Sequence, residues 1–306
     1  MLSYLRSALS NTKIDFMKFH KLALIMSVVC MLISAILVFT RGLNFGIDFS
    51  GGILIEARMQ EIADVSEVRN LLEKEAKDVQ IQNIDQKDLL IRVAKSEIEQ
   101  TVLIKKIQEI LSQNYPNIEY RKIDYVGPQV GSELIMKGVM ALLMSFAFIM
   151  IYIWIRFDWQ FGLGGIFALL HDAVLTVGFF SVTQLEFNLT SIAAILTIIG
   201  YSINDSVVIY DRIRENLIKF KKMSLSDLIN SGTNSTLSRT ILTAGTTLTS
   251  LLALIIFGGE TLKSFSLATF FGIVIGTYSS IYISAPILIY LDPRQKEKTN
   301  IKKVNE

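Results

Sequence analysis

The stretch LTSIAAILTIIGYSINDSVVIYDRIREN, residues 189–216, decides the class of this protein and raises a question about its function. Residues 189–199 are mainly apolar, and apolar residues remain frequent from Gly200 to Tyr210. A cluster of charged residues begins at Asp211. A helix needs about 20 apolar residues to cross the hydrocarbon core of a membrane. The pattern therefore predicts a membrane-spanning helix, and Asp205 is a carboxylate within its apolar part.

The composition of the whole chain agrees with a membrane protein. Hydrophobic residues make up 51% of the 306 residues, and the mean hydropathy is +0.45. A soluble domain of this size would be less apolar and more charged. The formal net charge of +2 gives no reason to expect a nucleic-acid partner. Cys30 is the single cysteine, so no disulfide within the chain is possible.

Six apolar segments are long enough to span a membrane. The first follows a basic stretch, as in a signal peptide, but it is long for one and no small-residue cleavage site follows it. We therefore interpret it as a retained membrane anchor. The predicted spans are residues 22–39, 134–155, 161–182, 185–210, 240–258 and 264–291. The fold class that follows is an all-α bundle of six membrane helices, of which the last five occupy residues 134–291.

Lysine and arginine are concentrated on one side of this predicted bundle. Residues 1–21 carry four of them, the loop 211–239 carries six and the tail 292–306 carries five. The two short connections on the opposite side carry only Lys263. Because basic residues favour the cytoplasmic side, we expect both termini in the cytoplasm. Residues 40–133 are then a large external, periplasmic domain.

The external segment has the periodicities of a small α+β domain. No metal-ligand spacing, catalytic triad or phosphate-binding loop occurs in its sequence, so we expect a recognition or lever domain without a cofactor, a metal or enzymatic activity. The order strand, helix, strand, strand, helix, strand is that of a ferredoxin-like fold. These elements are predicted at residues 53–59, 65–76, 79–84, 88–93, 97–114 and 117–126.

The face of the fourth span that carries Asp205 is polar or small. Spacings of three and four residues place Tyr201, Thr197, Ala194 and Thr190 on this face. The alternative is a carboxylate at the end of a span that reaches the headgroups, but aspartate is too short to reach far. Ionisable residues at membrane depth are costly and mark ion pathways. We therefore expect Asp205 to point into the bundle and to have a function there.

Arg239 lies at the start of the fifth span, at a depth similar to that of Asp205, so that an ion pair is sterically plausible. An arginine would favour the charged form of the carboxylate, whereas burial would favour the neutral form. Two forms close in free energy are what a proton carrier needs. The alternative is that Arg239 is an ordinary basic residue on the cytoplasmic side.

His171 and Asp172 lie near the middle of the third span. Consecutive helix residues are about 100° apart, so their side chains need not touch each other. A mid-span histidine can hydrogen-bond to a neighbouring helix or relay protons. We favour packing for His171 and leave the role of Asp172 open.

The sixth span carries a repeat of small residues. Gly272, Gly276, Ser280 and Ser284 recur at every fourth position. Such a face permits the close approach of another helix. We expect it to pack against a helix of this chain or of a partner.

Six motifs follow one another along the chain. They are FGIDFSGG after the first span, VGPQVGSEL before the second, LLHD in the third, GYSINDSVVIYDRIREN in the fourth, TLSRTILTAGTTL at the fifth and FGGETLKSFSLATFFGIVIGTYSSIY leading into the sixth. Over roughly residues 20–291 the chain resembles the SecF branch of the SecD/SecF family of protein-export membrane proteins, within the RND superfamily. The resemblance implies half of an RND-type transporter.

The resemblance also implies a function and partners. Members of this branch pair with SecD, a homologous six-span subunit, in the bacterial cytoplasmic (inner) membrane. Membrane lipids are therefore expected to contact the chain. They work with the SecYEG channel, and with YajC as a further partner, on unfolded polypeptides at a late stage of export. The proton motive force is thought to move the external domains, and the positions on the proton path are Asp205 and Arg239 here. Some members use sodium instead.

Two other functions fit parts of the sequence. A half-size RND exporter of a lipid or small molecule would share the membrane carboxylate, but it would need a substrate pocket for which residues 40–133 leave little room. A purely structural translocon scaffold would use Asp205 only as a packing contact.

Overall fold

The structure is a computed structural model that describes residues 12–294 apart from 62, 75, 77–78, 85–86 and 94–98. For residues 128–129 and 260–261 only the backbone is described. The chain forms two compact units. The helical unit contains the described residues of Met1–Asn44, Leu142–Leu185 and Thr190–Glu306, and the sheet unit contains those of Phe45–Ala141 and Glu186–Leu189.

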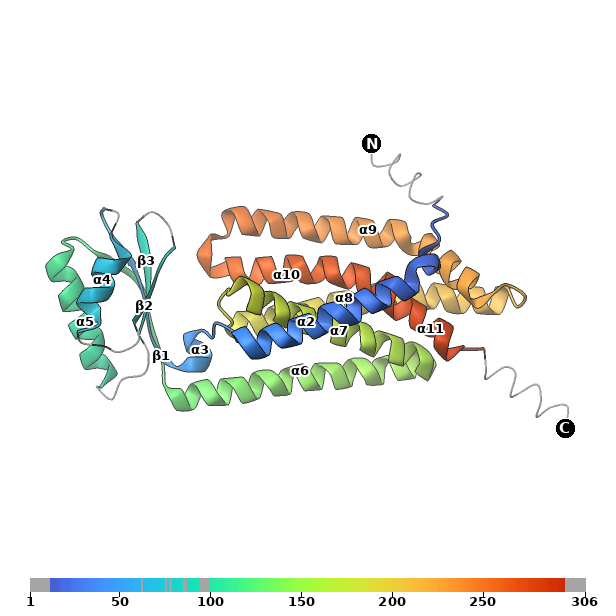
Figure 1. The fold of residues 1–306 in the computed structure, drawn as a ribbon, viewed down its shortest axis with the longest axis horizontal. Helices are drawn as coiled ribbons and strands as arrows, with labels where there is room; N and C mark the ends of the chain where they lie inside the picture. The colour runs from blue at the N-terminus through green and yellow to red at the C-terminus, as the bar shows by residue number, and fades with distance from the viewer. Residues whose placement is uncertain are drawn as a thin grey trace. The chain divides into compact units, whose positions relative to one another are not determined.

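The six predicted spans are confirmed, since six helices of the described chain are long and apolar enough to cross a membrane. Figure 1 shows the helices of the helical unit side by side as a bundle. The six spans are α2 (His20–Arg41), preceded by the 3₁₀ turn η1 (Phe16–Phe19), α6 (Pro128–Arg156), α7 (Trp159–Thr183), α8 (Leu189–Lys219), α9 (Leu225–Phe257), and the continuous run of α10 (Gly259–Ser279), η2 (Ser280–Ser284) and α11 (Ala285–Leu291). The part of α6 up to Ala141 and the first residue of α8 belong to the sheet unit.

The helices differ in how much of their apolar surface the chain itself covers. Within the apolar stretch, 56% of the residues of α7 and 61% of those of the sixth span are buried, against 11% in α6 and 17% in α2. Large exposed apolar surfaces need another covering, either lipid or a second protein chain. The interior of the unit, where polar side chains can be sequestered, therefore lies around α7, α8 and α10.

The segment 211–239, predicted as a polar loop, is mostly helical. Helix α8 continues to Lys219, and only residues 220–224 connect it to α9. Hydropathy detects the apolar part of a helix and misses its polar extension beyond the membrane. Ion pairs along the helix support this extension, including one of 2.7 Å between Arg212 and Glu215.

The first turns of α9 are also well-defined structure. The Ser224 hydroxyl caps the helix by accepting a hydrogen bond from the backbone N–H of Asp227 at 3.1 Å. A Cβ atom on Gly232 would lie 2.8 Å from Cγ1 of Ile213. The glycine thus allows α9 to approach the extension of α8 closely.

The sheet unit has the predicted order of elements. Its strands lie in the order β2-β3-β1-β4 with every neighbouring pair antiparallel, and α4 and α5 cover one face (Figure 1). The elements are α3 (Ile47–Ser50), β1 (Gly52–Arg58), α4 (Val65–Leu72), β2 (Val79–Asn83), β3 (Asp88–Val93), α5 (Gln100–Asn114) and β4 (Glu119–Val126).

Paired residues of neighbouring strands build the core of this unit. Ile55 pairs with Ile91 on β3 and with Ile123 on β4. Ile55 and Ile91 are fully buried, in one cluster with Leu103 and Ile107 of α5. Residues two apart on a strand share a face, so the period-two pattern directs these side chains toward the helices.

One ion-pair group joins three elements of the sheet unit. Asp88 is buried and accepts hydrogen bonds from Arg58 at 2.8 Å and from Arg121 at 2.9 Å. The hydrogen bond from Arg58, together with the charges of both arginines, holds the pKa of the Asp88 carboxyl below its usual value and outweighs the opposing effect of burial. The group ties the ends of β1, β3 and β4 together.

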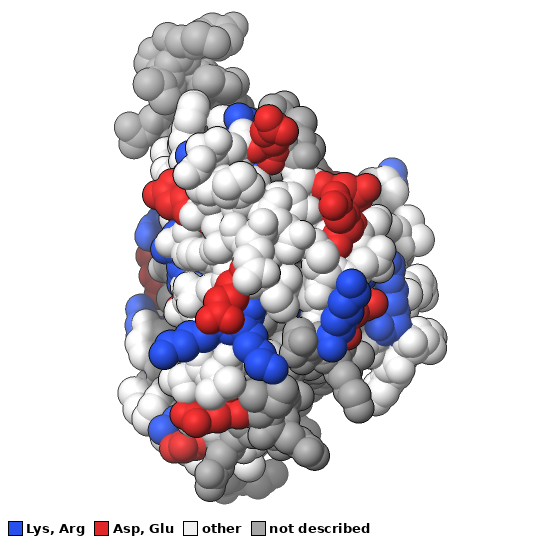
Figure 2. Space-filling model, turned by 90° about the vertical axis from the view of Figure 1, so that its left-hand side faces the viewer, with Lys and Arg blue, Asp and Glu red and all other residues white. Residues whose placement is uncertain are grey.

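The face of the sheet unit that carries α4 and α5 has mixed charge. Figure 2 shows acidic and basic side chains interspersed with uncharged surface on this side. Helix α5 alone exposes Lys105, Lys106 and Glu109. Among the described residues seen in this view, neither sign forms a continuous patch of the kind that attracts a polyanion.

Candidate functional site

Asp205 lies inside the helical unit and joins three helices. It is 8% exposed on α8. Its Oδ1 accepts a hydrogen bond from the Thr240 hydroxyl of α9 at 2.5 Å, and its Oδ2 accepts one from the Ser280 hydroxyl of η2 at 2.5 Å. Two hydroxyl donors replace water around the carboxyl group, as a buried polar group requires.

A second buried carboxyl group, that of Asp172 on α7, joins another set of helices. It is completely buried. Its Oδ2 accepts hydrogen bonds from Ser202 of α8 at 2.5 Å and from Ser279 of α10 at 2.8 Å. The Nδ1 atom of His171 lies 3.0 Å from its Oδ1. Both acidic side chains thus take their donors from neighbouring helices.

The two carboxyl groups meet the same short segment of the sixth span. Ser279 ends α10, and Ser280 begins η2, a π-helical segment. Single π-helical turns within α-helices are rare and frequently occur at functional sites. A hydroxyl can donate one hydrogen bond while accepting others. The arrangement is therefore suited to respond to the gain or loss of a proton at either carboxyl group.

Small residues bring the sixth span close to α8. A Cβ atom on Gly276 would lie 3.1 Å from Cβ of Ser202, and one on Gly272 would collide with the side chain of Ile198. Farther along, Ser284 donates to the hydroxyl of Tyr210 at 2.6 Å. The repeat of Gly272, Gly276, Ser280 and Ser284 lies against helices of this same chain.

Arg239 and Asp205 form no direct ion pair in the structure. Arg239 is exposed and forms no ion pair within the described residues, whereas the next residue, Thr240, is buried and donates to Asp205. Consecutive helix residues point about 100° apart, so only one of the two can face the carboxylate. The expected pair of Asp205 and Arg239 is absent from this arrangement, although both residues lie at the same depth.

The buried face of α8 also differs from the expected one. Ala194 is buried as expected, but Thr197 and Thr190 are exposed and Tyr201 is half-buried, whereas Ser202 is 1% exposed. Gly200 is not a point of close helix approach among the described residues, since a Cβ atom there would meet nothing within 4 Å. The face of α8 that packs against the neighbouring helices is the one that carries Ser202.

His171 does contact its neighbour. The Nδ1 atom of His171 and the Oδ1 atom of Asp172 meet at 3.0 Å despite the angular separation of the two residues. The His171 ring also packs on Tyr278, with ring centres 6.2 Å apart. His171 therefore packs against the sixth span, as favoured from the sequence, and contacts Asp172 within its own helix. Its role in proton relay stays a prediction.

Sequence reasoning missed four hydroxyl groups or their roles. Ser202 follows Tyr201 and Thr240 follows Arg239, both of which were predicted to lie near the carboxyl group. Ser280 was predicted only as a small residue of the packing face. Ser279 precedes it. Two adjacent serines in an apolar span were the available signal. No group of three or more His, Cys, Asp or Glu side chains that could hold a metal ion occurs among the described residues.

Comparison with known proteins gives matches over nearly the whole chain. Residues 106–294 match the family "Protein export membrane protein SecD/SecF, C-terminal", and residues 36–61 match the SecD/SecF GG motif. The chain is 54% identical over 288 residues to protein translocase subunit SecF of Rickettsia bellii (strain OSU 85-389), covering 93% of this chain and 95% of that protein. It is 53% identical over 293 residues to SecF of Rickettsia conorii, covering 94% and 95%.

Solved structures of SecDF share the fold. The crystal structure of SecDF, a translocon-associated membrane protein, from Thermus thermophilus matches with a TM-score of 0.84 and 35% identity over 93% of this chain and 39% of that one. A SecDF structure in a super-membrane-facing form matches with a TM-score of 0.71 over 95% and 40%. The chain spans about two fifths of these SecDF chains. The family match and the SecF relatives establish that this chain belongs to the SecD/SecF family of protein-export membrane proteins, on its SecF branch.

Proposed function

We propose that this chain is a SecF-like subunit of the bacterial Sec translocase that uses the proton motive force to promote late-stage export of polypeptides. The observation that carries the proposal is Asp205, a buried carboxyl group held by hydroxyls from two other helices. Family membership supports an accessory translocase subunit, not an enzyme. The proton coupling is our inference from the site.

A buried carboxyl group between helices can convert ion movement into helix movement. Moving one elementary charge through a membrane potential releases about 2.3 kcal/mol per 100 mV. Protonation turns an acceptor-only carboxylate into a group that also donates, so the hydroxyls of Thr240 and Ser280 would have to rearrange. Two packings that differ by a few kcal/mol are enough for such a switch.

In this proposal, Arg239 reaches Asp205 when α9 rotates about its axis. Because Arg239 and Thr240 are consecutive, a turn of α9 by about 100° about its axis would exchange one for the other at Asp205. The state described here has Thr240 at the carboxyl group. We propose that Arg239 faces Asp205 in the other state of the cycle. Tyr201, half-buried on α8, would lie beside this path, whereas the exposed Thr197 has no assigned part.

We infer the partners from the relatives. The matching SecDF chains are more than twice as long as the aligned part, and we assign SecD as the partner that completes the unit. Its contact with this chain would cover apolar residues that α2, α6 and α9 leave exposed. We extend the proposal to SecYEG and YajC and to the exported polypeptide. The sheet unit would be a ferredoxin-like domain on the periplasmic side, with both termini in the cytoplasm.

The test is export by membrane vesicles that contain this chain together with its SecD. Translocation of a secretory precursor is measured with ATP, with and without a proton gradient. With Asp205→Asn, the stimulation by the gradient should fall to the level seen without a gradient, while ATP-driven export and SecD association persist. The matched control is Glu215→Gln, an exposed acidic residue on the same helix. If the proton gradient still stimulates translocation fully in the Asp205→Asn vesicles, the proposal is wrong.

A further inference from the structure

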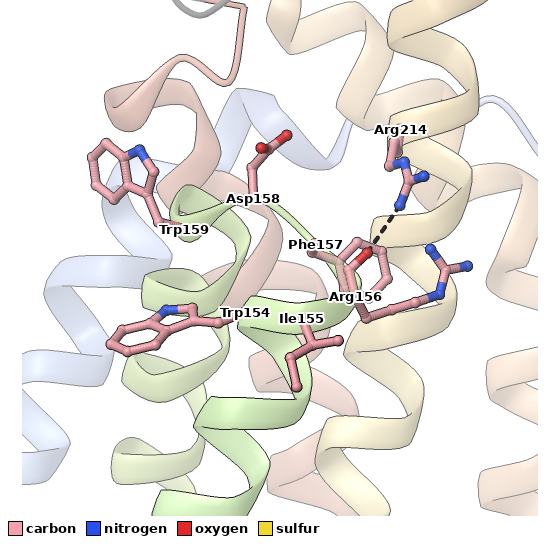
Figure 3. Close-up of a pocket in the computed structure, with 7 residues that line it drawn as sticks. All are labelled: Trp154, Ile155, Arg156, Phe157, Asp158, Trp159 and Arg214. Atoms are coloured by element: carbon pink, nitrogen blue, oxygen red, sulfur yellow. Dashed lines mark hydrogen bonds between the residues drawn. The ribbon is translucent and has the colours of Figure 1, made fainter.

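The turn between α6 and α7 forms a cleft against α8. Its volume is about 520 Å³. Helix α6 ends at Arg156 and α7 begins at Trp159, so the cleft lies at the ends of two membrane-spanning helices. This is the depth at which lipid headgroups meet a membrane protein. The cleft is lined by Trp154, Ile155, Arg156, Phe157, Asp158, Trp159 and Arg214 (Figure 3).

Two guanidinium groups are held at one side of the cleft. Arg214 donates to the backbone carbonyl oxygen of Arg156 at 3.0 Å, and this bond uses one of its five N–H donors. The guanidinium groups of Arg156 and Arg214 lie 4.9 Å and 5.9 Å from the centre of the Phe157 ring. Arg156 also pairs with Asp211 at 2.7 Å. The buried ring and these bonds orient both cations without enclosing them.

The opposite side of the cleft is aromatic and apolar. Figure 3 shows the indole rings of Trp154 and Trp159 on the other side of the turn from the two guanidinium groups. They are 53% and 51% exposed, and Ile155 is 82% exposed. Exposed tryptophans favour the interface between headgroups and acyl chains. The cleft thus combines cationic donors with a surface that suits the upper part of an acyl chain.

We propose that this cleft binds an anionic phospholipid, with its phosphate group at Arg156 and Arg214 and its glycerol and first methylene groups at the two tryptophans. Guanidinium groups match phosphate oxygens in geometry. Basic pockets between membrane helices near a headgroup layer bind anionic lipids in other proteins. Asp158 is the one acidic residue of the lining, and it limits the attraction. The proposal requires that these helices cross a membrane but does not depend on proton coupling.

The chain provides its own reporter for a test. It contains only two tryptophans, and both line the cleft. The full chain is reconstituted in vesicles of phosphatidylcholine. In one set of vesicles a fraction of the lipid is brominated phosphatidylglycerol, and in the other set it is brominated phosphatidylcholine. Both lipids carry the bromine near the headgroup end of the acyl chain. Quenching of tryptophan fluorescence then reports which lipid occupies the cleft. We expect preferential quenching by the brominated phosphatidylglycerol.

Matched variants separate a site from general surface charge. Each arginine near the surface contributes about fivefold to anionic-lipid preference, so Arg214→Gln should lower the preference about fivefold. Arg212→Gln should lower it much less, because Arg212 is on the same helix but lies outside the cleft lining, and its charge is already paired with that of Glu215. Asp158→Asn should raise the preference, which keeps the test informative if Arg214→Gln impairs folding.

Three results would overturn the proposal. The first is equal quenching by the two brominated lipids in the unaltered chain. The second is an equal loss of preference in Arg212→Gln and Arg214→Gln. The third is relief of the phosphatidylglycerol quenching by millimolar inorganic phosphate, which would assign the cleft to a free anion. Persistence of that quenching in phosphate supports the lipid.

Discussion

Ser279 and Ser280 are neighbours in the chain, yet their hydroxyl groups donate to carboxyl groups on two different helices. Ser279 reaches Asp172 of α7 at 2.8 Å, and Ser280 reaches Asp205 of α8 at 2.5 Å. One peptide unit joins the two serines at the start of η2. A shift of the backbone at this point would therefore displace both hydroxyls, so that one segment of the sixth span contacts both buried carboxyl groups.

Removal of the Ser280 hydroxyl should weaken the response to the proton gradient without abolishing it. In Ser280→Ala, Thr240 still donates to Asp205, so one of two donors remains. Vesicle export should retain part of its gradient stimulation. Thr277→Ala is the control, because within the described part of the chain the Thr277 hydroxyl bonds only to the backbone of its own helix, at Ile273. Equal effects of the two substitutions would argue against a specific role for Ser280.

Two buried serines on α8 should differ in their contribution to stability. Ser202 donates to Asp172, whereas the hydroxyl of Ser206 is buried without a hydrogen-bond partner among the described residues. Ser202→Ala should lower the free energy of unfolding by about 0.5–2 kcal/mol, because an acceptor loses its donor. Ser206→Ala should be neutral or slightly stabilising. Thermal unfolding in detergent measures both, and a reversed order would contradict the hydrogen-bond assignment.

A larger side chain at Gly276 should separate the sixth span from α8. The Cβ atom alone would lie 3.1 Å from Ser202, so Gly276→Leu should cost about 1–3 kcal/mol through overpacking and lower both recovery and melting temperature. Gly245→Leu on α9 is the matched control, since a Cβ atom there meets nothing within 4 Å. Similar losses in both variants would indicate a general intolerance of glycine replacement.

The stability of the sheet unit should depend on pH through Asp88. Since the pKa of Asp88 is depressed in the folded state, its contribution is complete at pH values above its unfolded pKa of about 3.9. It is lost as the pH falls through the lower folded pKa. Asp88→Asn should therefore destabilise the unit at pH 7 by about 1–2 kcal/mol, and the difference from the unaltered chain should shrink below about pH 4.

The stability difference between Asp88→Asn and the unaltered chain is measured by hydrogen exchange of β1 and β3. The measurement uses the full chain between pH 3 and pH 7. Lys122→Gln is the control, because its ion pair with Asp124 is exposed on both sides. A difference between the unaltered chain and Asp88→Asn that is independent of pH would contradict the ionic basis of the effect.

Local patterns predicted most of the architecture. The period-two run at residues 79–84 and the predicted strand at residues 88–93 became β2 and β3, and the apolar run at residues 161–182 became α7. These patterns work because a residue's burial follows from its helix or strand periodicity. The polar extensions of α8 and α9 were missed because hydropathy reports the depth of the membrane and not the length of the helix.

The site was predicted only in part. Asp205 and Asp172 stood out because a carboxylate in an apolar span is rare. The predicted partner, Arg239, was one residue away from the observed donor, Thr240. A sequence gives the depth of a residue along its span, but the direction of its side chain depends on how the whole helix is rotated. An error of one position corresponds to about 100°.

By itself the sequence determined the number of spans, the order of elements in the sheet unit and the presence of two carboxyl groups at membrane depth, because each of these follows from short-range periodicity and composition. Only the tertiary structure decided what surrounds those carboxyl groups. The donors to Asp205 come from 35 and 75 residues away in the chain. Their selection depends on how helices pack and rotate against one another, which no local pattern records.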